Sequence, residues 1–391
     1  MGQSLFQFKK DTIVKWYYYD GDEFNDSSYD EGKWIPAYSW STLNYDFKYL
    51  MTPKRLEFEN GVCHFVCDRD TGIYEIPAWQ LDSTFRKKFG ADIINGNKFP
   101  YYFTAGNLWS KSQYERGYFE IRFKTTDAYG IWPAFWMYGS NDDEIDFFEL
   151  KGERVKDIHV DVHCRRGCDK TYKGTGIFPR SFGGWIRSTR RLNESYNVVS
   201  GEWQDGYIKW YLNGQGIAYF KGSLSSQKMS LMVGTGPAED GKPFAPGVNS
   251  TTYFPNRFDV DYIRVWYKNK RENTSVAGKK NAQFDYFETS DPPLSRLRKK
   301  IKFMYSRREF KKDVMTVSVL PQSNGSILLS ASGRNIYYTV KVYDASGTEL
   351  QQRSISELFT EIALPGQKKG DVVKVRIERD GKCAEDNLII Q

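Results

Sequence analysis

The sequence predicts an all-β protein, in which a large antiparallel sandwich or jelly roll is followed by a smaller β-sandwich. Through residues 55–268 hydrophobic side chains mostly alternate with a period of two, as in strands with one buried face. Asn213-Gly214 separates two such runs, and this dipeptide favours a tight hairpin turn. Long helical patterns are nearly absent, and a chain of 391 residues with 40% hydrophobic and 16% aromatic content can bury a large core.

The expected strands of the first domain follow one another with short polar connections. They lie within residues 55–67, 117–126, 158–164, 207–220 and 258–268. We therefore assign residues 1–268 to one large domain, in which the strands pack as two sheets.

The composition and the hydrophobic pattern of the sequence change after residue 268. Residues 269–312 are polar, contain Pro292-Pro293 and end in a basic run, which indicates a linker. From residue 313 to residue 391 short alternating runs return between glycine-bearing turns. About 80 residues suffice for an immunoglobulin-like sandwich, which is the predicted fold of this second domain, whose role is left unassigned.

The formal net charge of +7 is unevenly distributed. Residues 296–312 hold nine basic residues and one acid, and residues 164–191 hold eight and one. A basic run is usually a solvated surface, so no nucleic-acid partner is expected, although binding of the linker to an anionic surface remains open. No run approaches the ~18 apolar residues of a membrane span, and the first residues lack a secretory signal, so the chain as given is expected to be soluble.

Five cysteines leave at least one thiol unpaired within a single chain. Cys63 and Cys67 lie near His64, and Cys164 and Cys168 lie near His163. Neither spacing is that of a zinc knuckle, so buried thiols or a local disulfide between Cys164 and Cys168 are favoured over a zinc site.

Three acids interrupt a stretch that otherwise resembles a buried strand. In the segment EIDFFE, Glu144 and Asp146 share one strand face, whereas Glu149 would point into the core on a regular strand. Burying an unpaired carboxylate costs several kcal/mol, so we predict a β-bulge that returns Glu149 to the face of the other two.

Carboxylates facing one another across a cleft are what glycosidic-bond cleavage requires. Four effective strand steps separate the Cα atoms of Glu144 and Glu149 by ~13 Å, and inward-leaning side chains leave ~5 Å between carboxyls, which suits retention. Acids that merely face solvent, or that bind calcium, are the alternative interpretations. With three histidines and no nucleophile motif, a serine or cysteine nucleophile has little support.

The sequence resembles glycoside hydrolase family 16 over roughly residues 17–268. The resemblance rests on ERGYFEIRFKTTDAYGIWPAFWMYG, on Glu144-x-Asp146-x-x-Glu149, and on SGEWQDGYIKWYLNG and YFPNRFDVDYIRVW in the same order. It implies a concanavalin-like jelly roll with Glu144 as nucleophile, Asp146 as assisting acid and Glu149 as general acid/base. His163 matches a histidine that the family places on the neighbouring strand, close to the acid/base.

The resemblance also implies which residues contact the substrate. The candidate sugar-stacking residues are Trp132, Trp136, Trp109 and Trp203, with core packing as the alternative for Trp136. Asp261 matches the position of a structural calcium in many members, and a salt-bridged surface aspartate is the alternative. No cofactor is expected for catalysis.

The bulged signature resembles the laminarinase-like, agarase-like and carrageenase-like branches. Arg165 and Arg166 open a basic stretch that suits an anionic glycan, with solvated loop arginines as the alternative. We therefore expect an endo-acting, retaining β-glycan hydrolase acting on a β-1,3-glucan or β-galactan, sulfated or not. By the resemblance it is secreted, periplasmic or on the cell surface, and a monomer is expected. The alternative is a carbohydrate-binding jelly roll without catalysis.

Overall fold

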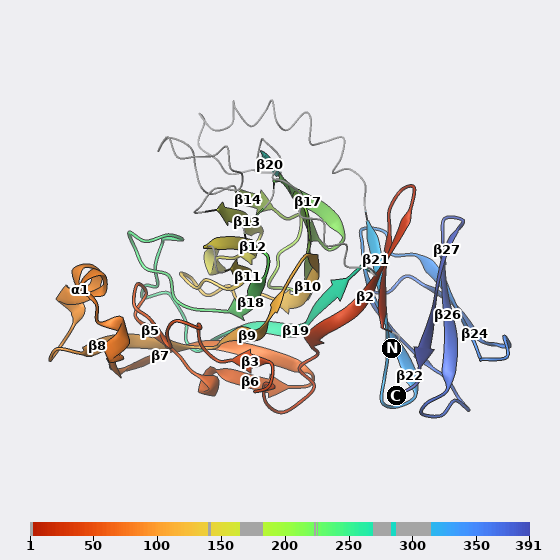
Figure 1. Ribbon diagram of the computed structural model, residues 1–391, viewed down its shortest axis with the longest axis horizontal. Coiled ribbons are helices and arrows are strands. Elements are labelled where there is room, and N and C mark those ends of the chain that lie inside the picture. The colour runs from red at the N-terminus through yellow and green to blue at the C-terminus, as the bar shows by residue number, and fades with distance from the viewer. Residues whose placement is uncertain are drawn as a thin grey trace.

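The computed structural model describes residues 3–139, 142–164, 183–222, 224, 226–268, 283–286 and 314–391, the segment 283–286 by its backbone alone. Almost all regular structure in these residues is β-strand, which confirms the predicted fold class (Figure 1). No helix in this part of the chain has the length and apolar character needed to cross a membrane.

The sheet that carries the acids has seven strands. Its strands, in spatial order, are β14 (Gly184–Arg187), β13 (Asp157–Cys164), β12 (Asp143–Glu149), β11 (Ala134–Gly139), β18 (Met229–Gly234), β9 (Asn107–Tyr114) and β3 (Trp34–Ile35). Every pairing in it is antiparallel, so neighbouring strands present matched rows of side chains to the core and to the opposite face.

A second, larger sheet covers the buried face of the first. Its main path is β20 (Gln283–Tyr286), β17 (Gln215–Lys221), β16 (Tyr207–Leu212), β15 (Asn197–Gln204), β10 (Gly117–Lys124), β19 (Asn256–Tyr267), β2 (Ile13–Asp22), β1 (Ser4–Phe8), β21 (Met315–Pro321), β22 (Ser326–Ser332) and β25 (Phe359–Ala363). The predicted hairpin at Asn213-Gly214 joins β16 to β17, and both residues have the positive φ that such a turn requires.

Shorter strands and the helices lie off this path. The strands are β4 (Leu43–Asn44), β5 (Tyr49–Met51), β6 (Leu56–Glu59), β7 (Val62–Glu75) and β8 (Lys98–Ala105). The helices are α1 (Ser83–Phe89) and the 3-10 turns η1 (Pro53–Arg55), η2 (Ala78–Gln80), η3 (Gly90–Asp92) and η4 (Gly152–Arg154). α1 lies between β7 and β8, far out on the hairpin they form (Figure 1), and Asp82 caps it by accepting a hydrogen bond from the Phe85 N–H.

The C-terminal residues form a second sandwich. β21, β22 and β25 face a four-stranded sheet of β24 (Glu349–Ile355), β23 (Tyr338–Tyr343), β26 (Val372–Arg379) and β27 (Lys382–Ile389). Its immunoglobulin-like topology and the predicted domain boundaries stay predictions.

Two pairings cross those predicted boundaries. β1 pairs with β2 on one side and with β21 on the other, so that one hydrogen-bonded sheet runs from the jelly roll into the C-terminal sandwich. Phe6 and Phe8 of β1 pack in the core of that sandwich. β20, inside the predicted linker, pairs with β17, and most of the linker lies outside the described residues.

The cysteines fit the interpretation without zinc. Cys63 and Cys67 are buried thiols, and burial raises the pKa of both. His64 Nδ1 lies 2.7 Å from Asp259 Oδ1, so the histidine has a carboxylate partner. Cys164 is disulfide-bonded.

Candidate active site

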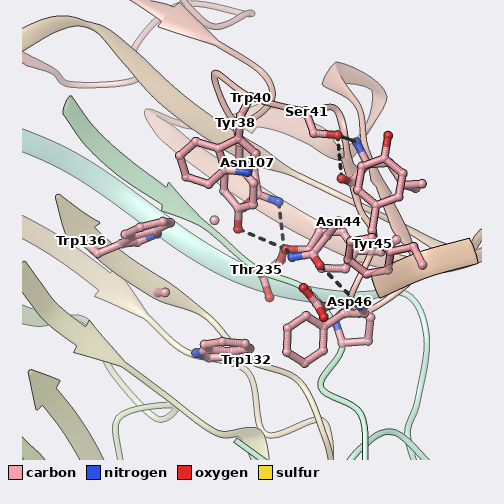
Figure 2. A pocket seen from close by; sticks show the side chains of 18 of the residues that line it. Tyr38, Trp40, Ser41, Asn44, Tyr45, Asp46, Asn107, Trp132, Trp136 and Thr235 are labelled. Atoms are coloured by element: carbon pink, nitrogen blue, oxygen red, sulfur yellow. Dashed lines mark hydrogen bonds between the residues drawn. The ribbon is translucent and has the colours of Figure 1, made fainter. Parts of the chain in front are cut away.

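A pocket of about 490 Å³ opens beside the acid-bearing strand. Figure 2 shows Trp132 and Trp136 on one side of it and Tyr38 and Trp40, from the segment after β3, on another. Glu144, Asp146 and Glu149 also line this pocket. The three acids therefore share one cavity with aromatic walls.

A β-bulge brings the three acids to that one face. Phe148 pairs with Phe135 of β11 and Asp146 pairs with Trp136, which leaves Phe147 as the extra residue. Against β13, Glu149 pairs with His159 and the register shifts at the same place. The predicted bulge is confirmed.

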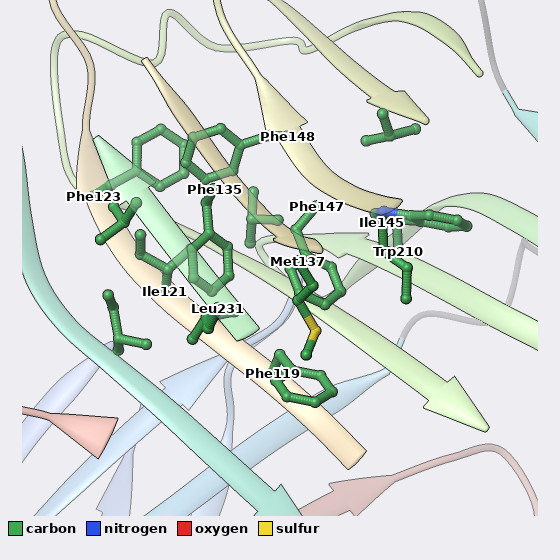
Figure 3. Close-up of a cluster of buried hydrophobic side chains, with 14 of the residues drawn as sticks. Phe119, Ile121, Phe123, Phe135, Met137, Ile145, Phe147, Phe148, Trp210 and Leu231 are labelled. Atoms are coloured by element: carbon green, nitrogen blue, oxygen red, sulfur yellow. The ribbon is translucent and has the colours of Figure 1, made fainter. Parts of the chain in front are cut away.

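The two phenylalanines show what the bulge accomplishes. Phe147 and Phe148 are adjacent in sequence, yet both are completely buried in the core between the sheets (Figure 3). Phe147 packs against Phe119, with ring centroids 5.4 Å apart, and Phe148 packs against Phe123 at 4.5 Å. Because two consecutive side chains face the core, Glu149 turns back towards the pocket.

Burial and mutual repulsion determine the charge of these acids. Asp146 is 2% and Glu149 is 8% exposed. Burial, followed by the charge of Glu144, raises the pKa of Glu149 well above its usual range. Burial, followed by the charge of Glu149, raises the pKa of Asp146. A buried carboxyl held in its protonated form near neutral pH is suited to donate a proton.

Two histidines of β13 contact the acids. His163 was expected close to the acid/base; it pairs with Glu144 across the strands, its Nε2 lies 3.2 Å from Asp146 Oδ2, and its charge also acts on Glu149. The histidine beside Glu149 is His159, whose Nδ1 lies 3.1 Å from Glu149 Oε2. His159 stands four residues before His163, on the same strand face, so two-residue alternation could have identified it.

The neighbouring acids raise the pKa of His163 in this setting. Burial alone would lower its pKa, but contact with Asp146, together with the charges of Asp161 and Glu144, raises it. Ligand atoms of Glu144, Asp146 and His163 lie within 4.8 Å of one another, a grouping that could hold a metal ion. Glu144 and Asp146 line the pocket and His163 contacts Asp146, so this grouping is part of the acid cluster itself.

Two of the four candidate tryptophans line the pocket. Trp132 and Trp136 do so, and Phe244 stacks on Trp132 with ring centroids 4.7 Å apart and planes 11° from parallel. Phe244 adopts a φ of 59°, a strained conformation for a bulky residue, and its ring also lies 5.2 Å from that of His159. The loop around Phe244 thus supports both Trp132 and the histidine beside Glu149.

The other two tryptophans are not in the pocket. Trp203 is 1% exposed within the core between the sheets, so its prediction as a sugar-stacking residue is wrong. Trp109 is 7% exposed and meets the exposed indole of Trp40 edge-on, with ring centroids 5.0 Å apart. Trp40 and Tyr38 line the pocket but were not predicted, because no local pattern places a loop against a distant strand.

The remaining candidates concern ions and charge. Asp261 forms an ion pair with Arg122, whose guanidinium also lies over the rings of Tyr196 and Phe359 at 4.3 and 4.0 Å. This ion pair is what the salt-bridge alternative predicts, and the calcium site stays a prediction. Arg165 and Arg166 lie outside the described residues.

Comparison with known proteins agrees with this geometry. Kappa-carrageenase of Pseudoalteromonas carrageenovora is 24% identical over 261 residues, which is 61% of this chain and 64% of that protein, so the chain spans just under two thirds of this relative. A glucan endo-1,3-beta-glucosidase of Cryptopygus antarcticus is 26% identical over 208 residues, 46% of this chain and 72% of that protein.

A solved structure shows the same fold. The endo-beta-1,3-glucanase from Pyrococcus furiosus superposes with a TM-score of 0.51 at 20% identity, over 65% of this chain and 95% of that one. The family "Glycosyl hydrolases family 16" matches residues 46–263, more than half of the sequence. This chain therefore belongs to glycosyl hydrolase family 16.

Proposed function

We propose that this chain is an endo-acting, retaining β-glycan hydrolase. The observation that carries the proposal is the bulge in β12, which places Glu144, Asp146 and Glu149 on one face of an aromatic-walled pocket. Burial raises the pKa of Glu149, as suits a general acid, and Glu144 lies at the other end of the acid triplet.

The two steps follow from these positions. The Glu144 carboxylate attacks the anomeric carbon while Glu149 gives its proton to the glycosidic oxygen, which leaves with the cleaved chain. Glu149, now a carboxylate, takes a proton from water as the water attacks the glycosyl-enzyme bond, and Glu144 is released. Asp146 is buried between the two glutamates, beside His163. Its charge affects the pKa of its neighbours, and its side chain orients the nucleophile.

The substrate is proposed as a β-1,3-glucan or a β-galactan, sulfated or not. The relatives that match this chain include both a glucan endo-1,3-beta-glucosidase and a kappa-carrageenase. These matches support the type of reaction more strongly than the identity of the sugar in the substrate. At the pocket itself Lys88 contributes a cation, but an ion pair of 2.7 Å with Asp46 partly neutralises it. Because polysaccharides do not cross membranes, we propose that the protein acts outside the cytoplasm.

The test replaces the nucleophile. Glu144→Gln should abolish release of reducing ends, by at least ~10³-fold, while thermal stability and glycan binding remain. Glu194→Gln is the matched control, because Glu194 is 66% exposed in a surface ion pair with Arg191. Turnover that survives in Glu144→Gln would exclude this mechanism.

Two further readouts define the reaction. Proton NMR of the first products should show the β-anomer, and initial release of the α-anomer would exclude retention. Laminarin, agarose, porphyran and carrageenan should be tested side by side, with products sized by mass spectrometry. Binding to one of them without any new reducing ends would favour the non-catalytic alternative.

A further inference from the structure

Two exposed indoles lie on the pocket wall beyond the acids. Trp40 is 40% and Trp79 is 70% exposed, yet both line the pocket that contains Glu144, Asp146 and Glu149. Trp79 is the most exposed large hydrophobic residue in the described part of the chain. The chemistry proposed above uses neither indole.

Hydrogen bonds join the two segments that carry the indoles. The Gln80 side chain donates to the backbone carbonyl of Trp40 at 2.5 Å, and the Tyr45 hydroxyl donates to the same Gln80 side chain at 2.6 Å. η2, which carries Trp79, is therefore tied to the segment that carries Trp40.

Aromatic packing fixes the helix next to η2. Tyr45 meets Phe85 of α1 edge-on, with ring centroids 4.8 Å apart, and meets Phe99 of β8 at 5.1 Å. These rings belong to a small hydrophobic cluster beneath α1, which anchors the tip of the hairpin to the jelly roll. Trp79 thus projects from a rigid support, although the indole itself lies in solvent.

Trp40 connects this support with the catalytic end of the pocket. Its ring lies 5.3 Å from Tyr138 and 6.5 Å from Trp136, both on β11 (Figure 2 shows Trp40 and Trp136). Trp109 supports the indole of Trp40 from below, edge-on. An aromatic surface therefore continues from Trp136, next to the acids, to Trp40, and Trp79 lines the same pocket from η2.

Pyranose rings carry an apolar face that packs on indoles, and hydroxyl groups at their edge that need polar partners. The same rim supplies polar partners in Asp46 and Lys88, which pair at 2.7 Å and both line the pocket. A flat apolar platform with a polar edge fits one or more sugar units of a glycan chain.

We propose that Trp40 and Trp79 form a distal glycan-binding subsite, which binds sugar units remote from the bond that is cut and makes the enzyme favour long chains. The proposal rests on the proposed function and deepens it, since the ligand is the same β-glycan. In this proposal the hairpin of β7 and β8, together with η2 and α1, selects substrates by the length of the glycan chain.

The test compares Trp79→Ala with wild type on a long and a short form of one glycan: laminarin against the shortest laminari-oligosaccharide that wild type still cleaves, and κ-carrageenan against the shortest carrageenan oligosaccharide that it cleaves. On the long form KM should rise about tenfold with kcat unchanged, as expected for loss of one aromatic stacking contact. On the short form both constants should stay as in wild type. Because Trp79 is mostly exposed, the melting temperature should not change.

Tyr102→Ala is the matched control, because Tyr102 is 47% exposed on β8 of the same hairpin and does not line the pocket. It should behave as wild type on both lengths. Trp40→Phe, which keeps a ring on the same support, should weaken the preference for long chains less than Trp79→Ala does. Equal KM for wild type and Trp79→Ala on the long form, or equal losses on both lengths, would overturn the subsite.

A binding arm separates this inference from the proposed function. In a Glu144→Gln background, which is not expected to turn over, affinity electrophoresis in laminarin or κ-carrageenan gels measures binding alone. Weaker retardation after Trp79→Ala supports the subsite even if wild type cleaves neither polymer, in which case only the proposed hydrolysis fails. Unchanged retardation, with wild type active and retarded, overturns the subsite and leaves the hydrolase assignment intact.

Discussion

Buried carboxylates occur on both sheets of the jelly roll, and their neighbours make them differ. On β15, Glu202 is completely buried, and burial alone would raise its pKa. Lys9 and Lys268, 3.5 and 3.6 Å away, together with the Tyr207 hydroxyl, hold its pKa below the usual value instead. On β12, Asp146 and Glu149 face other acids, and their pKa values rise.

Glu120 on β10 lies between these two cases. Burial raises its pKa to about 7, although Arg264 opposes the rise. Arg264 donates to both carboxylate oxygens of Glu23 at 2.7 Å, and its guanidinium remains 3.9 Å from Glu120. Burial therefore does not by itself distinguish a catalytic acid from a structural one. What distinguishes them is the balance of the neighbouring charges and whether a pocket reaches the carboxylate.

The largest expected effect is on activity, through loss of the proton donor Glu149 in the pocket. Glu149→Gln should lower kcat/KM by about 10³-fold, because the leaving oxygen loses its proton donor. In wild type kcat/KM should fall as pH rises through the raised pKa of Glu149, since only the protonated form donates. A pH–rate profile of both proteins checks this. If the variant's residual activity kept the same alkaline limb, the proton donor would be another group.

An intermediate effect is expected at the structural acid. Glu202→Gln should leave kcat/KM unchanged but reduce the free energy of unfolding by about 1–3 kcal/mol, because charge-assisted hydrogen bonds are lost. Because the pKa of Glu202 is lower in the folded protein than its unfolded value of 4.5, the ionised carboxylate stabilises the folded state above pH 4.5. This contribution to the free energy of unfolding is lost as the pH falls through the folded-state pKa. Urea unfolding at neutral and acidic pH measures the difference, which should shrink at acidic pH. A pH-independent difference would contradict the ion-pair interpretation of Glu202.

The smallest of the three effects is expected at His163. It is measured against a change at His64, because each of these two histidines pairs with an aspartate. His163→Asn should raise the pKa of Asp146 further and lower kcat by about tenfold, since contact with His163 favours the charged carboxylate. His64→Asn is the matched control, because His64 pairs with Asp259 between β7 and β19, away from the pocket. Equal activity of the two variants would show that His163 does not assist the cluster.

Local patterns were enough to predict much of the fold and the acid set. Two-residue alternation located the strands, and the cost of burying Glu149 on the wrong face led to the bulge. Trp203 shows the limit, since a strand tryptophan near a motif looks the same whether it faces a pocket or the core. The Trp40 and Trp79 wall and the pairing of β1 with β21 could not be predicted, because they join segments distant in sequence.

The place of β1 between β2 and β21 has a consequence for how the protein is made. Ser4 pairs with Val319, so the ribosome has to add some three hundred residues after β1 before its second partner exists. At about 5–20 residues per second, this edge waits for tens of seconds, while the hairpin with β2 can form at once. An unpaired strand edge invites pairing with other chains, so nascent molecules are most exposed to aggregation during that interval. Slower translation would lengthen this exposure, and chaperones that bind extended edges would shorten it.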